Sequence, residues 1–295
     1  MRMRVDELLA EAEARPFTGW DFSWLGDRMQ VERPWDYTQI VLDAARRAPN
    51  LLDMGTGGGE WLAELPFRPR CTIATEGWPP NVVGAARHLR EVGVPVVRDE
   101  GAADNARQAA EPPRGRLPFR DGAFHLVVNR HEAFVAGEVT RVLAPNGTFI
   151  TQQVDNANLD DLYGLLERDR VPPNPSWLPL AVEQIAGAGL EITDARTGIE
   201  TYRFSDVGAL AWYVAAVGPL HAEWAGFTIA AHHDSFVRLD TRARAGTPLE
   251  LRQRRLLVQA RRATPTRWAR ATDAGTRPGA SPRTRAGPPS RPANP

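Results

Sequence analysis

Acidic and glycine residues that can hold a ligand stand together in residues 53–60. This segment reads Asp-Met-Gly-Thr-Gly-Gly-Gly-Glu and directly follows the apolar residues Leu51 and Leu52. Glycine is needed where the backbone adopts φ > 0 or approaches a ligand closely. An apolar strand, a glycine turn and a helix beginning at Glu60 together form a nucleotide-binding crevice at the carboxyl edge of a parallel sheet. The residues expected to line the ligand are Gly55, Thr56, Gly57 and Gly59.

Asp53 indicates the charge of that ligand. A dinucleotide would place its pyrophosphate at the N-terminus of the following helix, where a fixed carboxylate repels it. S-adenosylmethionine has no phosphate and carries an ammonium and a sulfonium, so Asp53 suits this cation. A glycine turn is also found as a tight bend in other α/β proteins, and the flanking chain must therefore distinguish the two interpretations.

A second acid stands at the end of the next predicted strand. Residues 71–75 predict this strand, and Glu76 follows it. An acid about 20 residues beyond the glycine turn normally receives the ribose hydroxyls of a nucleotide. A helix N-cap role fits Glu76 poorly because Pro79 and Pro80 intervene. The spacing therefore strengthens the adenosine-ligand interpretation beyond what the glycines alone indicate.

Three motifs together resemble those of the class I S-adenosylmethionine-dependent methyltransferases, in particular the bacterial type 11 group. They are residues 53–60, Asn129-Arg130-His131-Glu132 and Leu143-Ala144-Pro145-Asn146-Gly147. By motif order the resemblance covers about residues 18–262. It implies an α/β fold: a Rossmann-like, seven-stranded, mostly parallel sheet with helices on both faces and an antiparallel last strand. It also implies S-adenosyl-L-methionine as the cofactor.

The reaction implied by the resemblance is in-line displacement of the sulfonium methyl group by a nucleophilic N, O or C atom. Holding the nucleophile, the methyl group and the sulfur in line can lower the activation barrier by about 7–11 kcal/mol. The resemblance places the acceptor beyond the fourth strand (residues 126–128), where Asn129 is expected to contact the cofactor. His131 is the candidate catalytic base, because its ordinary pKa of about 6.5 lets it accept a proton at neutral pH. In the alternative interpretation, His131 hydrogen-bonds the backbone and shapes the turn.

The chain departs from the family pattern near the expected adenine contact. Family members usually carry an acid shortly before the Leu-Pro-Phe of residues 117–119, but residues 113–116 here read Pro-Arg-Gly-Arg. Asp99 or Asp104 is the expected replacement. Relatives that methylate guanine in ribosomal RNA add a zinc-binding cysteine cluster, whereas this chain has one cysteine, Cys71. The Asn/Asp-Pro-Pro-aromatic signature of amino-group methylation is also missing from the sequence.

Composition excludes several function classes. All 36 Lys+Arg residues are arginine, which rules out a P-loop lysine, a Schiff-base lysine and a lysine base. The single cysteine rules out a disulfide framework and a cysteine-rich zinc site. His232, His233 and Asp234 suggest a metal, but adjacent residues point apart on a helix. We therefore favour a solvated face there and expect no metal.

The chain is expected to contain one folded domain and a tail. Residues 1–263 form the predicted methyltransferase domain, in which residues 1–48 are an N-terminal helical cap. Two aromatic segments of this cap, residues 19–25 and 34–37, form either a lid over the ligand or a packing cap on the sheet. Residues 264–295 are rich in Pro, Arg, Gly and Thr and predict a disordered tail. We find no signal peptide and no bilayer-spanning run, so a cytoplasmic location without membrane contact is expected.

The charge distribution favours a small-molecule acceptor over RNA. The whole chain has a formal net charge of +0, while the tail holds several arginines against the single acid Asp273. The folded part is therefore acidic on balance, whereas RNA binding needs a concentrated positive surface. A ribosomal RNA base methyltransferase and a non-catalytic cofactor-binding module of the same fold remain the alternatives. A dehydrogenase is disfavoured because the Asp53 carboxylate would repel the pyrophosphate of its dinucleotide cofactor.

Patterns of apolar residues place the remaining elements. The expected helices are residues 6–15, 37–47, 60–65, 81–92, 138–143, 156–168, 180–188 and 206–217. The expected strands are residues 50–54, 71–75, 94–98, 126–128, 148–154, 191–197, 201–204 and 255–261.

Overall fold

The computed structural model describes residues 4–17, 21–102, 116–156, 159–169, 175–220 and 224–264. Its contacts divide the chain into two units, Met1–Ala263 and Thr264–Pro295. The fold described below is that of the first unit. Apart from Thr264, the predicted tail lies outside the described residues.

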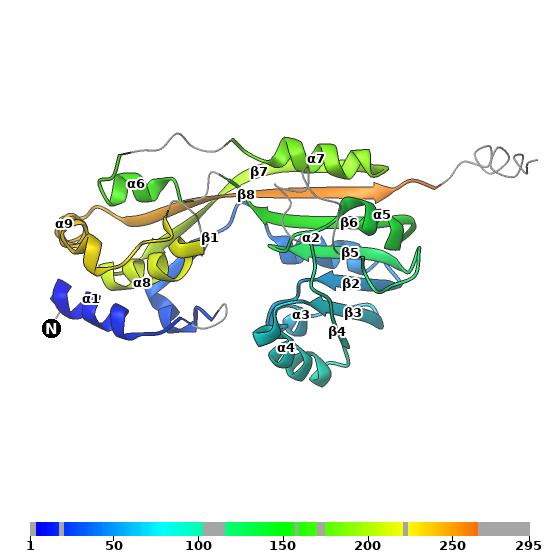
Figure 1. The fold of residues 1–295 in the computed structure, drawn as a ribbon, viewed down its shortest axis with the longest axis horizontal. Helices are drawn as coiled ribbons and strands as arrows, with labels where there is room; N and C mark the ends of the chain where they lie inside the picture. Colours follow the sequence, from blue (N-terminus) through cyan, green and yellow to red (C-terminus); the bar gives the residue numbers. More distant parts are fainter. Residues whose placement is uncertain are drawn as a thin grey trace, which may run out of the picture. The chain divides into compact units, whose positions relative to one another are not determined.

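A single mixed sheet runs through the first unit (Figure 1). In the described residues it has eight strands, in the order β1-β7-β8-β6-β5-β2-β3-β4. Strands β2 to β6 are parallel neighbours, and β8 runs antiparallel to both β6 and β7. The strands are β1 (Met29–Glu32), β2 (Asn50–Met54), β3 (Cys71–Glu76), β4 (Val96–Arg98), β5 (Phe124–Arg130), β6 (Leu143–Val154), β7 (Leu190–Phe204) and β8 (Leu249–Arg262). The predicted mostly parallel α/β sheet with an antiparallel last strand is confirmed.

Helices cover both faces of the sheet, as predicted. They are α1 (Val5–Ala14), α2 (Tyr37–Ala45), α3 (Glu60–Glu64), α4 (Pro79–Glu91), α5 (Ala136–Val142), α6 (Asp161–Leu165), α7 (Leu178–Gly187), α8 (Val207–Val217) and α9 (His233–Arg244), with 3₁₀ turns at η1 (Ser23–Arg28), η2 (Gly218–Leu220) and η4 (Ala230–His232). Helices α2, α3 and α4 share one apolar core with the sheet, and α5 and α7 share another on the opposite face. Helix α4 begins two residues earlier than predicted, since Pro79 and Pro80 occupy first-turn positions that need no N–H donor.

Two differences from the predicted strands have a physical reason. Strand β1 lies inside the segment predicted as a helical cap and adds an antiparallel edge to β7. Strand β7 is continuous where two strands, 191–197 and 201–204, were predicted, because it pairs with β8 along its length. Gly198 lies between the two predicted segments, and a Cβ there would lie 2.5 Å from the Cβ of Pro34. This glycine therefore allows close packing instead of ending the strand.

The predicted helix over residues 156–168 is also shorter in the structure. Among the described residues of this range, only α6, Asp161–Leu165, is helical. The last predicted strand is longer than expected, since β8 extends from Leu249 to Arg262.

A third core surrounds α8, around which α1, α9 and the ends of β7 and β8 are packed. Helix α8 is buried on nearly all sides, as its almost wholly apolar sequence requires. Asp206 caps it by accepting a hydrogen bond from the Ala209 N–H at 2.9 Å. Trp24 packs against Trp212 with ring centroids 5.1 Å apart. This contact supports the packing interpretation of the first aromatic segment. No helix in the described part of the chain is long and apolar enough to cross a membrane.

Candidate functional site

The glycine turn after β2 has the backbone conformation that its sequence predicts. Gly55, Gly57 and Gly59 have φ of 69°, 66° and 86°, values that side chains disfavour. The Thr56 N–H donates to the carbonyl oxygen of Thr75 at 2.9 Å. The turn is thus fixed to the end of β3, at the carboxyl edge of the parallel strands.

Glu76 fastens the same turn to the beginning of α4. Its Oε2 accepts a hydrogen bond from the Gly57 N–H at 2.7 Å, and its Oε1 accepts one from the Trp78 N–H at 2.8 Å. Each carboxylate oxygen retains acceptor capacity for a further donor such as a hydroxyl. The structure therefore places Glu76 at the ligand edge, and its contact with ribose remains a prediction.

Glu132 lies directly over the turn, and the sequence analysis did not select it. A Cβ built on Gly55 would lie 2.4 Å from the Cβ of Glu132, and one built on Gly101 would lie 2.7 Å from its Oε1. The Glu132 side chain therefore lies between the glycine turn and the loop after β4. The only sequence signal for it was an acid two residues beyond the end of β5.

Four carboxylates surround this edge of the sheet. Burial, with a contribution from Glu76, raises the pKa of Asp53 to about 6. Burial and the charges of Glu76 and Asp99 raise the pKa of Glu132 to about 7. Asp99 is half-buried, its pKa is also raised by burial, and its N–H donates to the Glu76 carbonyl at 3.2 Å. Asp104, the other predicted adenine residue, lies outside the described residues.

These carboxylates favour a cation. The raised pKa values of Asp53, Asp99 and Glu132 report buried ionised forms that are only partly compensated, although Arg130 lowers the pKa of Asp53. Asp53 Oδ2 is also buried without a hydrogen-bond partner among the described residues. Cationic groups of a ligand would supply the missing charge, so the residues present fit an ammonium and a sulfonium.

The Asn129 side chain makes hydrogen bonds within the sheet, and its contact with the cofactor remains a prediction. Asn129 is fully buried, and its Oδ1 accepts hydrogen bonds from Thr151 Oγ1 at 2.9 Å and from Gln153 Nε2. Its amide lies 3.5 Å from the carbonyl oxygen of Met54. Asn129 therefore ties β5 to β6 and approaches the end of β2.

His131 is joined to Gln152 through both backbone and side chain. It has φ of 63°, and its N–H donates to the Gln152 carbonyl at 2.9 Å. The Gln152 Oε1 accepts from Trp35 Nε1 at 2.6 Å, so its Nε2 is the donor toward His131 Nε2 at 3.2 Å. In this assignment His131 Nε2 carries no proton and its lone pair is already used.

The surroundings of His131 also affect its charge. The His131 side chain is exposed to solvent, but neighbouring protein atoms also surround much of it. This crowding, together with Arg255 and Arg130, lowers the pKa of His131 well below its usual 6.5. The imidazole is therefore neutral at pH 7. Its proton is on Nδ1, the ring nitrogen that does not face Gln152. The geometry favours the interpretation in which His131 shapes the turn.

Arg130 brings a positive charge to the same edge. Its guanidinium lies 5.1 Å from the ring centroid of Trp61, and Trp61 packs on Tyr37 at 5.4 Å. The Tyr37 hydroxyl donates to the Asn129 carbonyl at 3.3 Å. These aromatic side chains therefore position Arg130 next to the acidic turn.

The histidines of α9 lie away from this site. Among the described residues, no group of three or more His, Cys, Asp or Glu side chains is arranged to hold a metal. His233 Nε2 lies 3.2 Å from Asp6 Oδ1, and hydrogen bonding to Asp6 and Asp234 raises the pKa of His233. His233 is exposed, so this cluster is a surface ion pair.

The strand arrangement decides the fold family. A mostly parallel sheet with an antiparallel last strand carries, after β2, a glycine turn that opens toward an acid at the end of β3. The chain has the class I methyltransferase fold. No protein-family model matches the sequence, and no curated protein matches it.

Solved structures of this fold resemble the chain at low sequence identity. YcgJ from Bacillus subtilis aligns with a TM-score of 0.49 and 16% identity, over 77% of this chain and 98% of that protein. Geranyl diphosphate methyltransferase in complex with SAM gives 0.43 and 14%, over 77% and 84%. The [4+2]-cyclase SpnF gives 0.43 and 19%, over 77% and 80%. These likenesses concern the fold.

Proposed function

We propose that this protein is an S-adenosyl-L-methionine-dependent methyltransferase whose acceptor is a small molecule. The observation that carries the proposal is the set of four carboxylates, Asp53, Glu76, Asp99 and Glu132, around a glycine turn with φ > 0. A phosphate-bearing ligand would be repelled there, whereas a cation is attracted. Bound at this edge, S-adenosyl-L-methionine would supply a methyl group already activated on sulfur.

Several residues of the chain would divide the binding task. Glu76 would accept the ribose hydroxyls, because it is held rigidly by Gly57 and Trp78. Asp53 and Glu132 would compensate the positive charges of the ligand. Arg130 is the cation suited to pair with the carboxylate of the ligand.

For the proton of the acceptor we favour a residue other than the predicted His131. His131 uses its acceptor nitrogen for Gln152 in this geometry. Glu132 has a pKa of about 7, which matches that of an effective base at neutral pH, and it lies against the glycine turn. Glu132 is therefore the better candidate where the acceptor retains its proton. Acceptors that are already deprotonated need only to be oriented.

Calorimetric titration tests the cofactor assignment. Wild-type protein should bind S-adenosylmethionine and reject NAD, and Glu76→Ala should weaken the binding clearly. Glu91→Ala, at an exposed position of α4, is the matched control and should bind as the wild type does. Unchanged affinity in Glu76→Ala would refute the ribose assignment, and a preference for NAD would refute the proposal as a whole.

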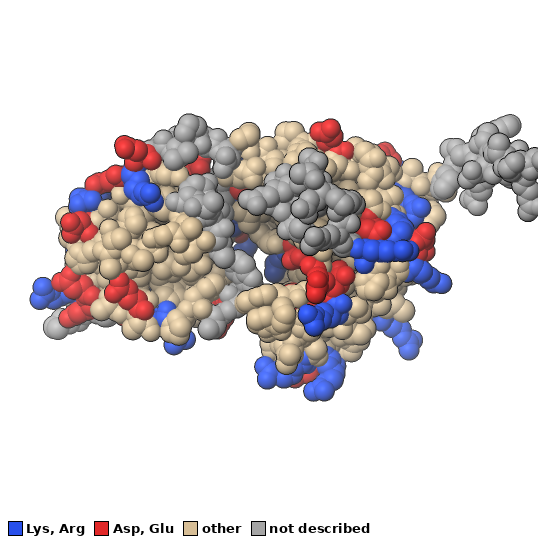
Figure 2. Space-filling view, in the orientation of Figure 1, with Lys and Arg blue, Asp and Glu red and all other residues tan. Residues whose placement is uncertain are grey.

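The charge of the folded part supports the acceptor class. Six of the 36 arginines and one of the 36 acids lie in residues 264–295, which leaves residues 1–263 with a net charge of −5. On the face drawn in Figure 2, arginines are interspersed with Asp and Glu and form no continuous positive patch. RNA recognition would need such a patch.

A labelled methyl donor tests the acceptor class directly. Small phenols, amines and carboxylic acids are offered beside ribosomal RNA, to the full chain and to a chain ending at residue 263. The truncated protein should retain its activity on a small acceptor. Tight, salt-sensitive RNA binding by the truncated protein would overturn the small-molecule assignment, and cofactor binding without any product would favour the non-catalytic module.

A further inference from the structure

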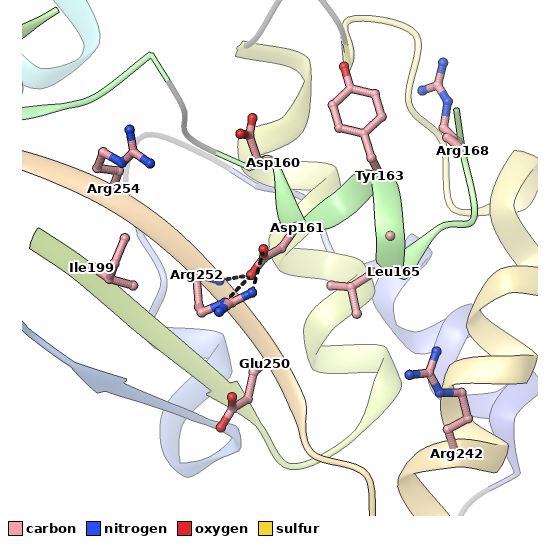
Figure 3. Close-up of a pocket in the computed structure, with 11 residues that line it drawn as sticks. Asp160, Asp161, Tyr163, Leu165, Arg168, Ile199, Arg242, Glu250, Arg252 and Arg254 are labelled. Carbon is pink, nitrogen blue, oxygen red and sulfur yellow. Dashed lines mark hydrogen bonds and ion pairs between the residues drawn. The ribbon is translucent and has the colours of Figure 1, made fainter. Parts of the chain in front are cut away.

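A cavity of about 820 Å³ lies against α6 and the β7–β8 pair (Figure 3). Because successive residues of a strand point to opposite faces, Arg252 and Arg254 face this cavity, whereas Gln253 and Arg255 face the other side of the sheet. No residue of the glycine turn lines it. The lining residues are Asp160, Asp161, Tyr163, Gly164, Leu165, Arg168, Ile199, Arg242, Glu250, Arg252 and Arg254.

Asp161 and Glu250, two acids of the lining, are paired with arginines. Asp161 Oδ2 accepts hydrogen bonds from Arg252 Nε at 2.8 Å and from the Arg252 N–H at 3.0 Å. Glu250 Oε1 accepts from Arg203 Nε at 2.7 Å, and Arg203 does not line the cavity. Besides Arg252, the lining holds Arg168, Arg242 and Arg254 but only one further acid, Asp160. The cavity therefore carries an excess of positive charge.

Those three arginines are weakly paired. Within the described residues the Arg242 side chain makes no ion pair or hydrogen bond, and Arg254 Nε lies 4.0 Å from Asp155 Oδ2. The Arg168 guanidinium lies 4.7 Å from the ring centroid of Trp224, a contact that orients it without neutralising it. In Figure 3 the guanidinium groups of Arg242 and Arg254 point toward the Asp161–Arg252 pair from opposite sides.

Apolar side chains complete the wall. Ile199 is 47% exposed, on a strand whose cavity face is otherwise polar, and Leu165 is half-buried beside it in the lining. We propose that this cavity binds a small organic oxyanion, a phosphate ester or a carboxylate, whose apolar part contacts Ile199 and Leu165. This inference is independent of the proposed methyl transfer and of the site at the glycine turn.

Calorimetric titration of the full chain with phenyl phosphate tests the proposal, with inorganic phosphate as the probe that lacks an apolar part. Phenyl phosphate should bind more tightly than inorganic phosphate. Arg242→Ala should lower the phenyl phosphate affinity about tenfold, since a charge-assisted hydrogen bond contributes about that factor. Arg242 is exposed, so this variant should fold normally.

Two further variants sharpen the test. Asp161→Asn should raise the affinity severalfold, because it releases the charge of Arg252. Arg47→Ala removes an exposed arginine of the segment between α2 and β2 and should change nothing. The proposal is overturned if wild-type protein binds neither probe at millimolar concentration, if Arg242→Ala binds as the wild type does, or if Arg47→Ala loses as much affinity as Arg242→Ala.

Discussion

Replacing Glu132 by Gln should make the protein more stable at alkaline pH and weaken its cofactor binding. In the folded chain the pKa of Glu132 is about 7 against an ordinary value of 4.5. The folded state therefore holds this proton more tightly than the unfolded state, and wild-type stability falls as pH rises from about 4.5 to about 7. At about 1.36 kcal/mol per pH unit this interval corresponds to about 3.4 kcal/mol, which partial solvent screening lowers to about 1–3 kcal/mol.

Urea unfolding at pH 5.5 and at pH 8.5 measures the effect, without added cofactor. The free energy of unfolding of wild-type protein should fall between these two pH values by about 0.6–1.8 kcal/mol more than that of Glu132→Gln, because the assay crosses only the part of the interval between pH 5.5 and about 7. Asp53, with a pKa of about 6, contributes a decrease of the same sign to both proteins. Glu91→Gln, at an exposed position, should follow the wild type. Parallel pH profiles for wild type and Glu132→Gln would refute the argument from carboxylate crowding.

Three other substitutions have defined outcomes. Gly55→Ala should lower the free energy of unfolding by about 2–4 kcal/mol, since Gly55 has φ of 69° and its Cβ would overlap Glu132; Gly84→Ala, where the space is open, should be neutral or stabilising in the same assay. Arg28→Ala should cost about 1–3 kcal/mol in thermal unfolding, because Arg28 donates to both oxygens of Asp206 at 2.7 and 2.9 Å; a variant as stable as the wild type would contradict this. His131→Ala should lower thermal stability and turnover together while the shape of the pH–rate profile persists; loss of an acidic limb with stability unchanged would instead make His131 the base.

The fold was accessible from the sequence because local patterns determine it. The apolar runs of β2, β3 and β5 and the glycines after β2 each specify their own conformation. Strand β1 was not accessible, since its four residues alternate between half-buried and exposed and only their pairing with β7 shows a strand.

Within the site, the residues that the glycine turn fixes locally were predictable, and those that depend on neighbouring strands were not. Asn129 was interpreted as a ligand contact from its place at a strand end. In the structure its side-chain oxygen accepts hydrogen bonds from Thr151 and Gln153 of β6. Which ring nitrogen of His131 is protonated depends on two residues remote in sequence. Trp35 donates to the Gln152 oxygen, and this turns the Gln152 amide nitrogen toward His131. The path of the loop that brings Glu132 onto Gly55 has no local sequence signature.

The length of the β7–β8 pair has a mechanical consequence. Their backbone pairing runs from Leu190 and Arg262 at one end to Phe204 and Leu249 at the other, with one irregularity near Ile192. One end of this ribbon belongs to the core around α8, and the other end to the core under α5 and α7 (Figure 1). Rotating one core against the other would bend two strands that share hydrogen bonds along their length. We therefore expect the paired strands to resist a hinge motion between the two cores.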